Sequence, residues 1–244
     1  MYSLKKNIMS KQIKRIASIF TFFVIAISLR YYIDVIKPSF LLDLHLYLQI
    51  LILGIGPLIG GLLVVKVFKR PNFLKIFGLN FWKTITIVAI PMVLFSFVGV
   101  IENGTPSLNL FKFIGIIILY ALFEEYGWRG YLQSELSDLK KIYKYLIITT
   151  LWFVWHLNFE ISISNLIFFL ALFAGSYGIG FMADRSKSLV MSALFHSFFN
   201  ISQTELLGEV QLSYKIIIIA ISAISAILIM RYDKDKDISM NQKQ

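Results

Sequence analysis

Two adjacent carboxylates stand in an otherwise apolar stretch of the sequence, between residues 119 and 133. Glu125 and Arg129 are four residues apart, which places them on one face of a helix and within reach of an ion pair. Glu124 points about 100° away from that face, where the sequence offers no nearby cation. Burial without a partner disfavours the charged form of a carboxyl group, which suits a group that exchanges protons near neutral pH. The doublet therefore predicts a structural acid, Glu125, beside a reactive one, Glu124.

Two of the three histidines fall in later apolar runs and supply complementary chemistry. His156 ends one run, and His196 precedes Asn200 by four residues, so that the last two share a helix face. An ionisable side chain at mid-bilayer costs ~2.5–3.5 kcal/mol on insertion scales, so such groups usually face a protein interior. At ~1.5 Å per residue, all three motifs lie roughly 10–20 Å deep from one side of a bilayer. We therefore predict a single cavity, open to the cytoplasm, that is lined by Glu124, His156, His196 and Asn200.

Each of these features also has a purely structural explanation. A Glu–Arg pair inside a span is often a packing clamp, and Glu125 with Arg129 is interpreted in this way. A single buried histidine is more often a hydrogen-bonded core residue than a catalyst. The recurrence of two histidines, an amide and an unpaired acid at one depth nevertheless favours a functional cluster. His45 has no such company and is interpreted as structural or interfacial.

The elements that must position these residues are predicted to be membrane-spanning helices. The chain is 57% hydrophobic and 16% charged, whereas soluble domains are typically ~25% charged. A bilayer core of ~30 Å is crossed by ~20 mostly apolar residues. On that criterion about eight spans are expected, near 16–33, 45–67, 84–101, 108–128, 143–160, 163–183, 188–203 and 212–231. The expected fold is an all-α, polytopic membrane helix bundle that forms one integral membrane domain over residues 1–244.

The placement of charge gives the expected orientation. A formal net charge of +10 could indicate nucleic acid, but the basic residues form short clusters between apolar runs, so no nucleic-acid partner is expected. With the N-terminus inside, alternate loops hold nearly all of the 24 basic residues, as the positive-inside rule requires. The exceptions are Arg30, Lys37, Lys112 and Lys215. Both termini are thus predicted to be cytoplasmic, and the lipid bilayer is the expected surrounding.

Small residues mark where helices are expected to pack closely. They recur in the second and sixth expected spans, at Gly54, Gly56, Gly60, Gly61, Gly175, Gly178 and Gly180. In lipid, such positions let two helix backbones approach. Pro57 is expected to kink the second span, because its ring clashes with the preceding turn.

The three polar motifs, taken in order, resemble the signature of the CAAX-protease and bacteriocin-processing family, also called CPBP or Abi. Its best understood branch is the type II CAAX prenyl endopeptidases. The motifs read Glu124-Glu125-x-x-x-Arg129, then His156 in the next span, then His196-x-x-x-Asn200. The resemblance covers about residues 110–203, the motif-bearing core. The family's second motif usually reads Phe-x-x-x-His, whereas Trp152 stands at the Phe position here, and we expect its packing against the histidine to be kept.

The resemblance implies a glutamate-dependent intramembrane endopeptidase without a metal or other cofactor. Glu124 with His156 would hold and deprotonate a water that attacks the scissile carbonyl, and His196 with Asn200 would donate hydrogen bonds to the oxyanion. Such donors are worth ~2.7–4 kcal/mol each in other hydrolases. Glu125 and its arginine partner would orient their helix. The implied substrate is a peptide or small membrane protein at the cytoplasmic face of a bacterial cell membrane, in peptide maturation or bacteriocin self-immunity.

Two alternatives remain open. Glu124, His156 and His196 offer a carboxylate and two imidazoles, which is a ligand set for zinc, although the sequence has no His-Glu-x-x-His helix. Intramembrane Glu and His residues also build proton relays, so the chain could be a non-enzymatic transporter, or an assembly or scaffold factor. A transporter is expected to contain inverted repeats, and we find none in this sequence.

Overall fold

The computed structural model describes residues 2–103, 107–203 and 210–241, and the side chains within 12–98, 107–203 and 210–230. These residues form helices and no β-strand, although one isolated bridge joins Lys75 to Ser188. The all-α prediction is therefore confirmed. In order, the elements are α1 (Tyr2–Tyr31), η1 (Tyr32–Ile36), α2 (Ser39–Leu42), α3 (Leu46–Leu53), α4 (Ile55–Lys66), α5 (Phe81–Asn103), α6 (Leu108–Glu125), η2 (Tyr126–Leu132), α7 (Gln133–Glu135), α8 (Lys141–Trp155), α9 (Ile163–Ser186), α10 (Leu189–Gln203) and α11 (Leu212–Asn241).

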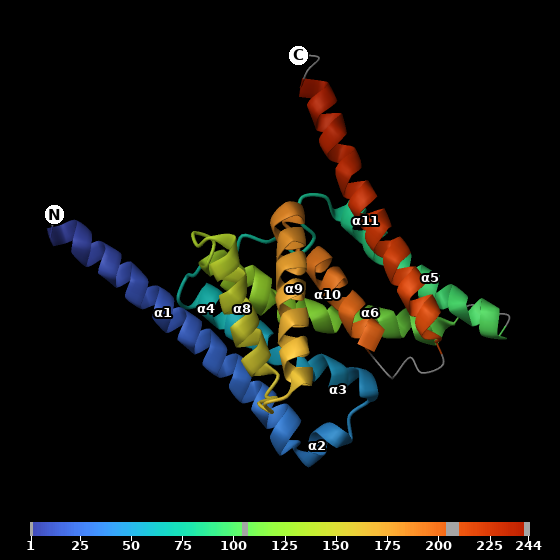
Figure 1. Ribbon diagram of the computed structural model, residues 1–244, viewed down its shortest axis with the longest axis horizontal. Coiled ribbons are helices and arrows are strands. Elements are labelled where there is room, and N and C mark those ends of the chain that lie inside the picture. Colours follow the sequence, from blue (N-terminus) through green and yellow to red (C-terminus); the bar gives the residue numbers. More distant parts are fainter. Residues whose placement is uncertain (1, 104–106, 204–209, 242–244) are drawn as a thin grey trace.

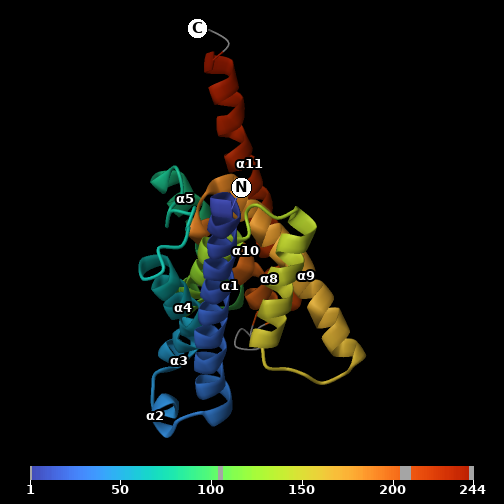
Figure 2. The same ribbon diagram turned by 90° about the vertical axis from the view of Figure 1, so that its left-hand side faces the viewer.

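The first and last helices form opposite flanks of the bundle, with the site helices between them. In Figure 1, α1 lies on one flank and α11 on the other, and α4, α6, α8, α9 and α10 fill the space between. In Figure 1 the start of α1 lies at the left of the bundle and the end of α11 projects from its top, and Figure 2 shows α1 in front of the bundle with the end of α11 again at the top. The orientation of the two termini in the membrane stays a prediction.

The helices differ in their ability to cross a bilayer. Among the described residues, four helices are long and apolar enough, at Gln12–Ile36, Phe81–Val98, Ile163–Ser186 and Leu212–Met230, and the pair α3–α4 makes a fifth if its 46° bend lies within one span. By contrast, α8 and α10 have only 15 residues each, and α6 carries Lys112 and both carboxylates of the doublet. The chain is thus a multi-pass membrane protein, and the count of eight spans stays a prediction. The three short or polar helices are those that carry the predicted site.

Glycines bring α1, α4 and η2 into backbone contact. A methyl group at Gly56 would lie 2.6 Å from the carbonyl oxygen of Ala26, and one at Gly127 would lie 2.5 Å from that of Pro57. A side chain at either position would push the helices apart, so the close packing predicted for the second span is confirmed. For Gly178 of α9 the same prediction is wrong, because nothing lies within 4 Å of an added methyl group there.

The bend in the second apolar segment falls at Gly54, between α3 and α4. Pro57 stands three residues later, in the first turn of α4. Its missing N–H has no helical partner in that turn, so proline is tolerated there and the chain bends just ahead of it.

Two apolar clusters meet at the acid doublet. One joins α5, α6 and α10 and includes Phe95, Ile117, Ala121 and Leu194. The other joins α1, η2 and α8 and includes Phe22, Trp128 and Ile148. The doublet lies in sequence between Ala121 of the first cluster and Trp128 of the second, and both of its acids are buried.

Candidate active site

The acid doublet lies where the helix changes its winding. The run from Leu108 to Glu135 is continuous, but Tyr126–Leu132 form a π-helical stretch, η2, between α6 and α7. Such wider turns are rare and are often found at functional sites. Gly127 allows this stretch to touch the backbone of α4 at Pro57. The doublet is therefore held at a point fixed by backbone contact.

Glu125 is the centre of a buried charged group. Its Oε1 atom accepts hydrogen bonds from Nη1 of Arg129, at 3.1 Å, and from Nδ1 of His196, at 2.8 Å. All three side chains are at most 3% exposed. The predicted Glu125–Arg129 pair is confirmed. The contact between Glu125 and His196 was not predicted, and it makes this acid the direct partner of a site residue.

Glu124 is equally buried but has a different kind of neighbour. It is 1% exposed, and its Oε2 atom accepts a hydrogen bond from the indole Nε1 of Trp152 at 3.1 Å. Among the described residues, no cation forms an ion pair with it. The two acids of the doublet thus have different partners, an arginine and an indole, and the reactive role of Glu124 stays a prediction.

Trp152 contacts most members of the site. Its ring packs edge-on against His196, with centroids 5.0 Å apart, and lies 5.9 Å from the ring of His156. The guanidinium carbon of Arg129 lies 4.9 Å from its centroid, a distance at which a cation is attracted to the ring face. The expected packing of this aromatic against His156 is confirmed. Its N–H bond to Glu124 is an additional function that phenylalanine could not supply.

One ring nitrogen of His156 is hydrogen-bonded to the backbone, and the other is an acceptor. It caps the end of α8 and is half-buried. Its Nδ1 atom lies 2.7 Å from the carbonyl oxygen of Trp152. Because a carbonyl only accepts, Nδ1 must carry the proton, and Nε2 of the neutral ring is then an acceptor. The indole of Trp152 contacts both imidazoles and bonds Glu124, so His156, His196 and Glu124 lie around one side chain.

Asn200 completes the predicted set as a donor without a partner. It follows His196 by one turn of α10. Its Nδ2 atom is buried, and among the described residues it has no hydrogen-bond partner. Buried amides are nearly always bonded, so an unpaired one calls for an explanation. His45 lies outside the site and caps α3, where its Nδ1 atom accepts from the backbone N–H of Tyr47 at 3.2 Å.

The site does not group its acids and imidazoles as metal ligands. Among the described residues, no three His, Cys, Asp or Glu side chains are placed to hold one metal ion. Glu124 and His196 face different partners, the indole of Trp152 and the carboxylate of Glu125. The zinc alternative therefore gains no geometric support.

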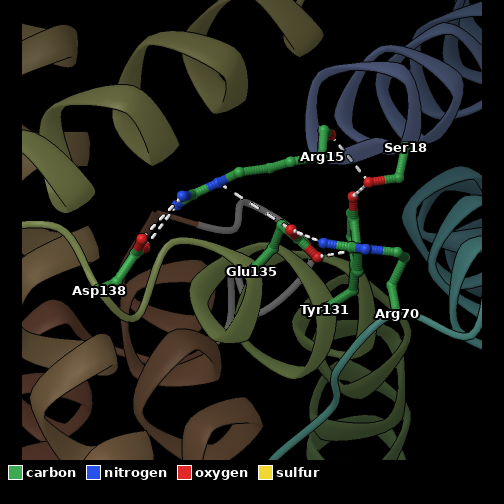
Figure 3. Close-up of polar contacts among 6 residues, drawn as sticks. All are labelled: Arg15, Ser18, Arg70, Tyr131, Glu135 and Asp138. Atoms are coloured by element: carbon green, nitrogen blue, oxygen red, sulfur yellow. Dashed lines mark hydrogen bonds and ion pairs between the residues drawn. The ribbon is translucent and has the colours of Figure 1, made fainter. Parts of the chain in front are cut away.

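A second polar cluster surrounds Glu135, at the C-terminal end of the helical run that begins at Leu108 (Figure 3). Both carboxylate oxygens of Glu135 accept from Arg70, one of them at 2.8 Å, and Nε of Arg15 lies 4.0 Å from this acid. Arg15 also forms a forked pair with Asp138, at 2.7 and 2.9 Å. The hydrogen bond to Glu135 raises the pKa of Arg70 above its ordinary value. We call Arg15, Arg70, Glu135 and Asp138 the clamp.

Sequence reasoning missed the clamp and the role of Arg30. It treated Arg15 and Arg70 only as loop charges, and the acids of the clamp have no pairing signal in the sequence. Arg30 appeared as an exception to the charge rule, whereas its guanidinium lies 4.6 Å from the ring centroid of Trp155 and pairs with Asp34 at 3.1 Å. It also interacts electrostatically with His156. The position of Arg30 inside an apolar run was the feature of the sequence that could have indicated such a partner.

Comparison with known proteins agrees with the motifs. The family model described as "Type II CAAX prenyl endopeptidase Rce1-like" matches residues 106–202. The chain is similar to the protein named CAAX prenyl protease 2 of Methanococcus maripaludis, with 31% identity over 49% of this chain and 49% of that protein. The chain thus spans about half the length of the curated relative that it matches. The matched segment contains the doublet, both site histidines and Asn200, and both comparisons support a relationship of this segment to the CAAX-protease family.

Proposed function

We propose that this chain is an intramembrane endopeptidase that hydrolyses a peptide bond with a water activated by Glu124 and His156. The observation that carries the proposal is the environment of Glu124: a buried carboxylate without a cationic partner, beside an imidazole whose Nε2 atom is an acceptor. Two bases that face one space can hold a water and take its proton.

The steps follow from the groups present. The water gives a proton to Glu124 as its oxygen attacks the scissile carbonyl carbon, and the carbonyl π electrons move to the oxygen. The tetrahedral intermediate then collapses, the C–N bond breaks, and the acid returns the proton to the leaving amine. His156 orients the water through Nε2. The direct products are a carboxylic acid and an amine, the new acid passes its proton to the amine to give a carboxylate and an ammonium group, and Glu124 is regenerated as a carboxylate.

His196 and Asn200 would stabilise the oxyanion. The amide Nδ2 of Asn200 is a buried donor that lacks a protein partner. His196 donates through Nδ1 to Glu125, so its Nε2 atom carries a proton only in the positively charged ring, and the charge of Glu125 compensates that form. We therefore assign Glu125 a positioning role through His196, in addition to its pair with Arg129.

The substrate class is a peptide or small membrane protein that reaches the site from the bilayer. We place the site within a bundle of about eight spans, open to the cytoplasmic side of a cell membrane and free of any cofactor. The relative's name refers to prenylated CAAX proteins, and peptide maturation or bacteriocin self-immunity are further roles within the same chemistry. Bacteria offer few prenylated proteins, so we favour an unmodified peptide precursor.

The test is hydrolysis by the purified chain in detergent. Peptides ending in a CAAX sequence, with and without a prenyl group, are incubated with the wild type and with Glu124→Gln at equal concentration, and mass spectrometry identifies the fragments. Fragments that require Glu124 support the enzyme. Equal fragments from both proteins would reject catalysis by Glu124. If a cellular phenotype of this chain persists in Glu124→Gln at normal membrane level, the transporter or scaffold alternative is correct instead.

A further inference from the structure

A cavity lies between the start of α8 and the end of α9, at the opposite end of α8 from His156. It has a volume of about 210 Å³ and is lined by Lys141, Tyr145, Tyr177, Phe181, Asp184 and Arg185. His156 follows Lys141 by fifteen residues, a rise of ~22 Å along α8, and the lining residue nearest to the site along this helix, Tyr145, precedes Trp152 by two turns. The proposed peptidase chemistry makes no use of this cavity.

The cavity carries a net positive charge. Asp184 is compensated, because it accepts from Nζ of Lys144 at 3.3 Å and from Nε2 of Gln133 at 2.8 Å. Lys141 and Arg185 are exposed on its rim, and among the described residues neither has an ion-pair partner. Two uncompensated cations beside a neutralised acid favour an anionic ligand.

The position of the cavity relative to the bilayer indicates which class of anionic ligand it could bind. α9 is a candidate span from Ile163 to Ser186, so Asp184 and Arg185 lie at its very end, where the hydrocarbon core meets water. Tyr145 and Tyr177 form the aromatic wall, with ring centroids 5.2 Å apart. Tyr145 is buried, and its hydroxyl donates to Asp184 at 3.4 Å, whereas Tyr177 is half-exposed, as is typical of tyrosine near the membrane interface.

An apolar strip on α9 leads from the cavity along the span. Tyr177 and Phe181 are 47% and 48% exposed, and Leu166 and Leu170 on the same face are 59% and 56% exposed. Residues at these spacings follow one face of a helix. A ligand with an anionic head in the cavity would therefore find a surface for an acyl chain directly beside it.

We infer that this cavity binds the headgroup of an anionic phospholipid, with the phosphate between Lys141 and Arg185 and an acyl chain along the exposed face of α9. Basic pockets between membrane helices recognise such headgroups through charge. The strip on α9 distinguishes a lipid from a free phosphate, because only a lipid gains from apolar contact with Tyr177 and Phe181. The site does not depend on peptidase activity.

The test measures lipid retained by the full-length protein in a neutral detergent. Short-chain phosphatidylglycerol is titrated and its bound fraction read by native mass spectrometry, with phosphatidylcholine as the neutral lipid and glycerol 3-phosphate as the headgroup without chains. The double variant Lys141→Ala/Arg185→Ala is compared with Lys14→Ala/Lys140→Ala, which removes two exposed lysines that do not line the cavity. All four side chains are exposed, so both variants are expected to fold, and a monodisperse peak in size-exclusion chromatography checks this.

Loss of two cations is expected to weaken phosphatidylglycerol binding about 30-fold, and the control variant less than about threefold. Phosphatidylcholine and glycerol 3-phosphate should bind weakly to all three proteins. If both double variants bound phosphatidylglycerol equally weakly, the lipid would be attracted by the overall positive charge of the surface, and the proposed site would be rejected. Competition by glycerol 3-phosphate as strong as that by the lipid would mean an anion site without lipid contact, and it would overturn the inference as well.

Discussion

The indole Nε1 of Trp152 donates a hydrogen bond to Oε2 of Glu124 across 3.1 Å, inside a region where the carboxylate is 1% exposed. The same ring packs against His196. One side chain thus fixes the acid and shapes the wall of the site. Phenylalanine, the usual residue in the family motif, would supply the wall but not the donor.

Trp152→Phe should lower turnover while leaving the protein folded. A hydrogen bond to a charged group is worth about 1.5–3 kcal/mol, so kcat is expected to fall about 10- to 100-fold with little change in KM. The matched control is Trp155→Phe, which removes an indole donor from the same helix, where Nε1 bonds the carbonyl oxygen of Ala26 at 3.1 Å. Steady-state kinetics on both variants tests whether the indole donor of Trp152 supports turnover. Equal losses in kcat would contradict this role.

Substitution of Glu124 should lower turnover, whereas substitution of Glu125 should lower folding stability. Glu124→Gln keeps an acceptor for the indole and is expected to lose about 10²–10⁴-fold in turnover with normal thermal stability. Glu125→Gln leaves Arg129 without its charged partner in a buried place, which costs about 3–5 kcal/mol of folding stability. Thermal unfolding in detergent, measured beside activity, separates the two. An unstable Glu124→Gln protein would argue that this acid is structural.

Asn200→Ala is expected to affect catalysis alone. Its buried Nδ2 atom has no protein partner among the described residues, so its loss removes no folding contact, whereas loss of one oxyanion donor lowers kcat about 10²–10³-fold. Asn165→Ala is the control, because that amide exchanges hydrogen bonds with Asn158 at 2.8 and 3.0 Å. The control should lose stability and keep its kcat. A stable, fully active Asn200→Ala protein would remove this residue from the site.

Substitution of the buried acid of the clamp should destabilise the protein more than substitution of the exposed one. Glu135 has a side chain that is 2% exposed, whereas that of Asp138 is 69% exposed, and both are bonded to arginine. Glu135→Gln is therefore expected to destabilise the protein by about 3–5 kcal/mol. Asp138→Asn should cost at most about 1 kcal/mol, since exposed ion pairs contribute little. Unfolding temperatures that rank these variants in the opposite order would show that burial does not decide the effect.

Chelation distinguishes the two forms of the proposed chemistry. A water activated by Glu124 and His156 requires no metal, so activity should persist after dialysis against a strong zinc chelator. A zinc enzyme would lose activity and regain it when zinc is restored. The assay is the peptide hydrolysis described above, with elemental analysis of the dialysed protein.

The sequence could predict the features that depend on helical spacing. Glu125 and Arg129 pair because residues four apart share a face, and Glu124 is left unpaired for the same reason. The apolar runs likewise marked the helices. Depth along each run predicted that His156 and His196 lie near each other, and the ring of Trp152 contacts both of them.

Features that depend on the rotation of one helix against another could not be predicted. Nothing in the sequence states that His196 bonds Glu125 and not Glu124, or that the indole of Trp152 turns toward the acid. The clamp joins residues more than sixty positions apart, where no periodicity applies. The apolar runs near 143–160 and 188–203 predicted the helices α8 and α10, but with 15 residues each their length does not decide whether they cross the bilayer.

The clamp bears on how the protein can be shortened. A fragment designed on the matched segment alone would omit Arg15 and Arg70, leaving Glu135 as a buried acid without either cation. It would also expose Gly127, whose bare backbone is now covered by α4. The segment with the three motifs is therefore not expected to fold by itself, and any minimal version must begin early enough to retain the first helix from Arg15 onward.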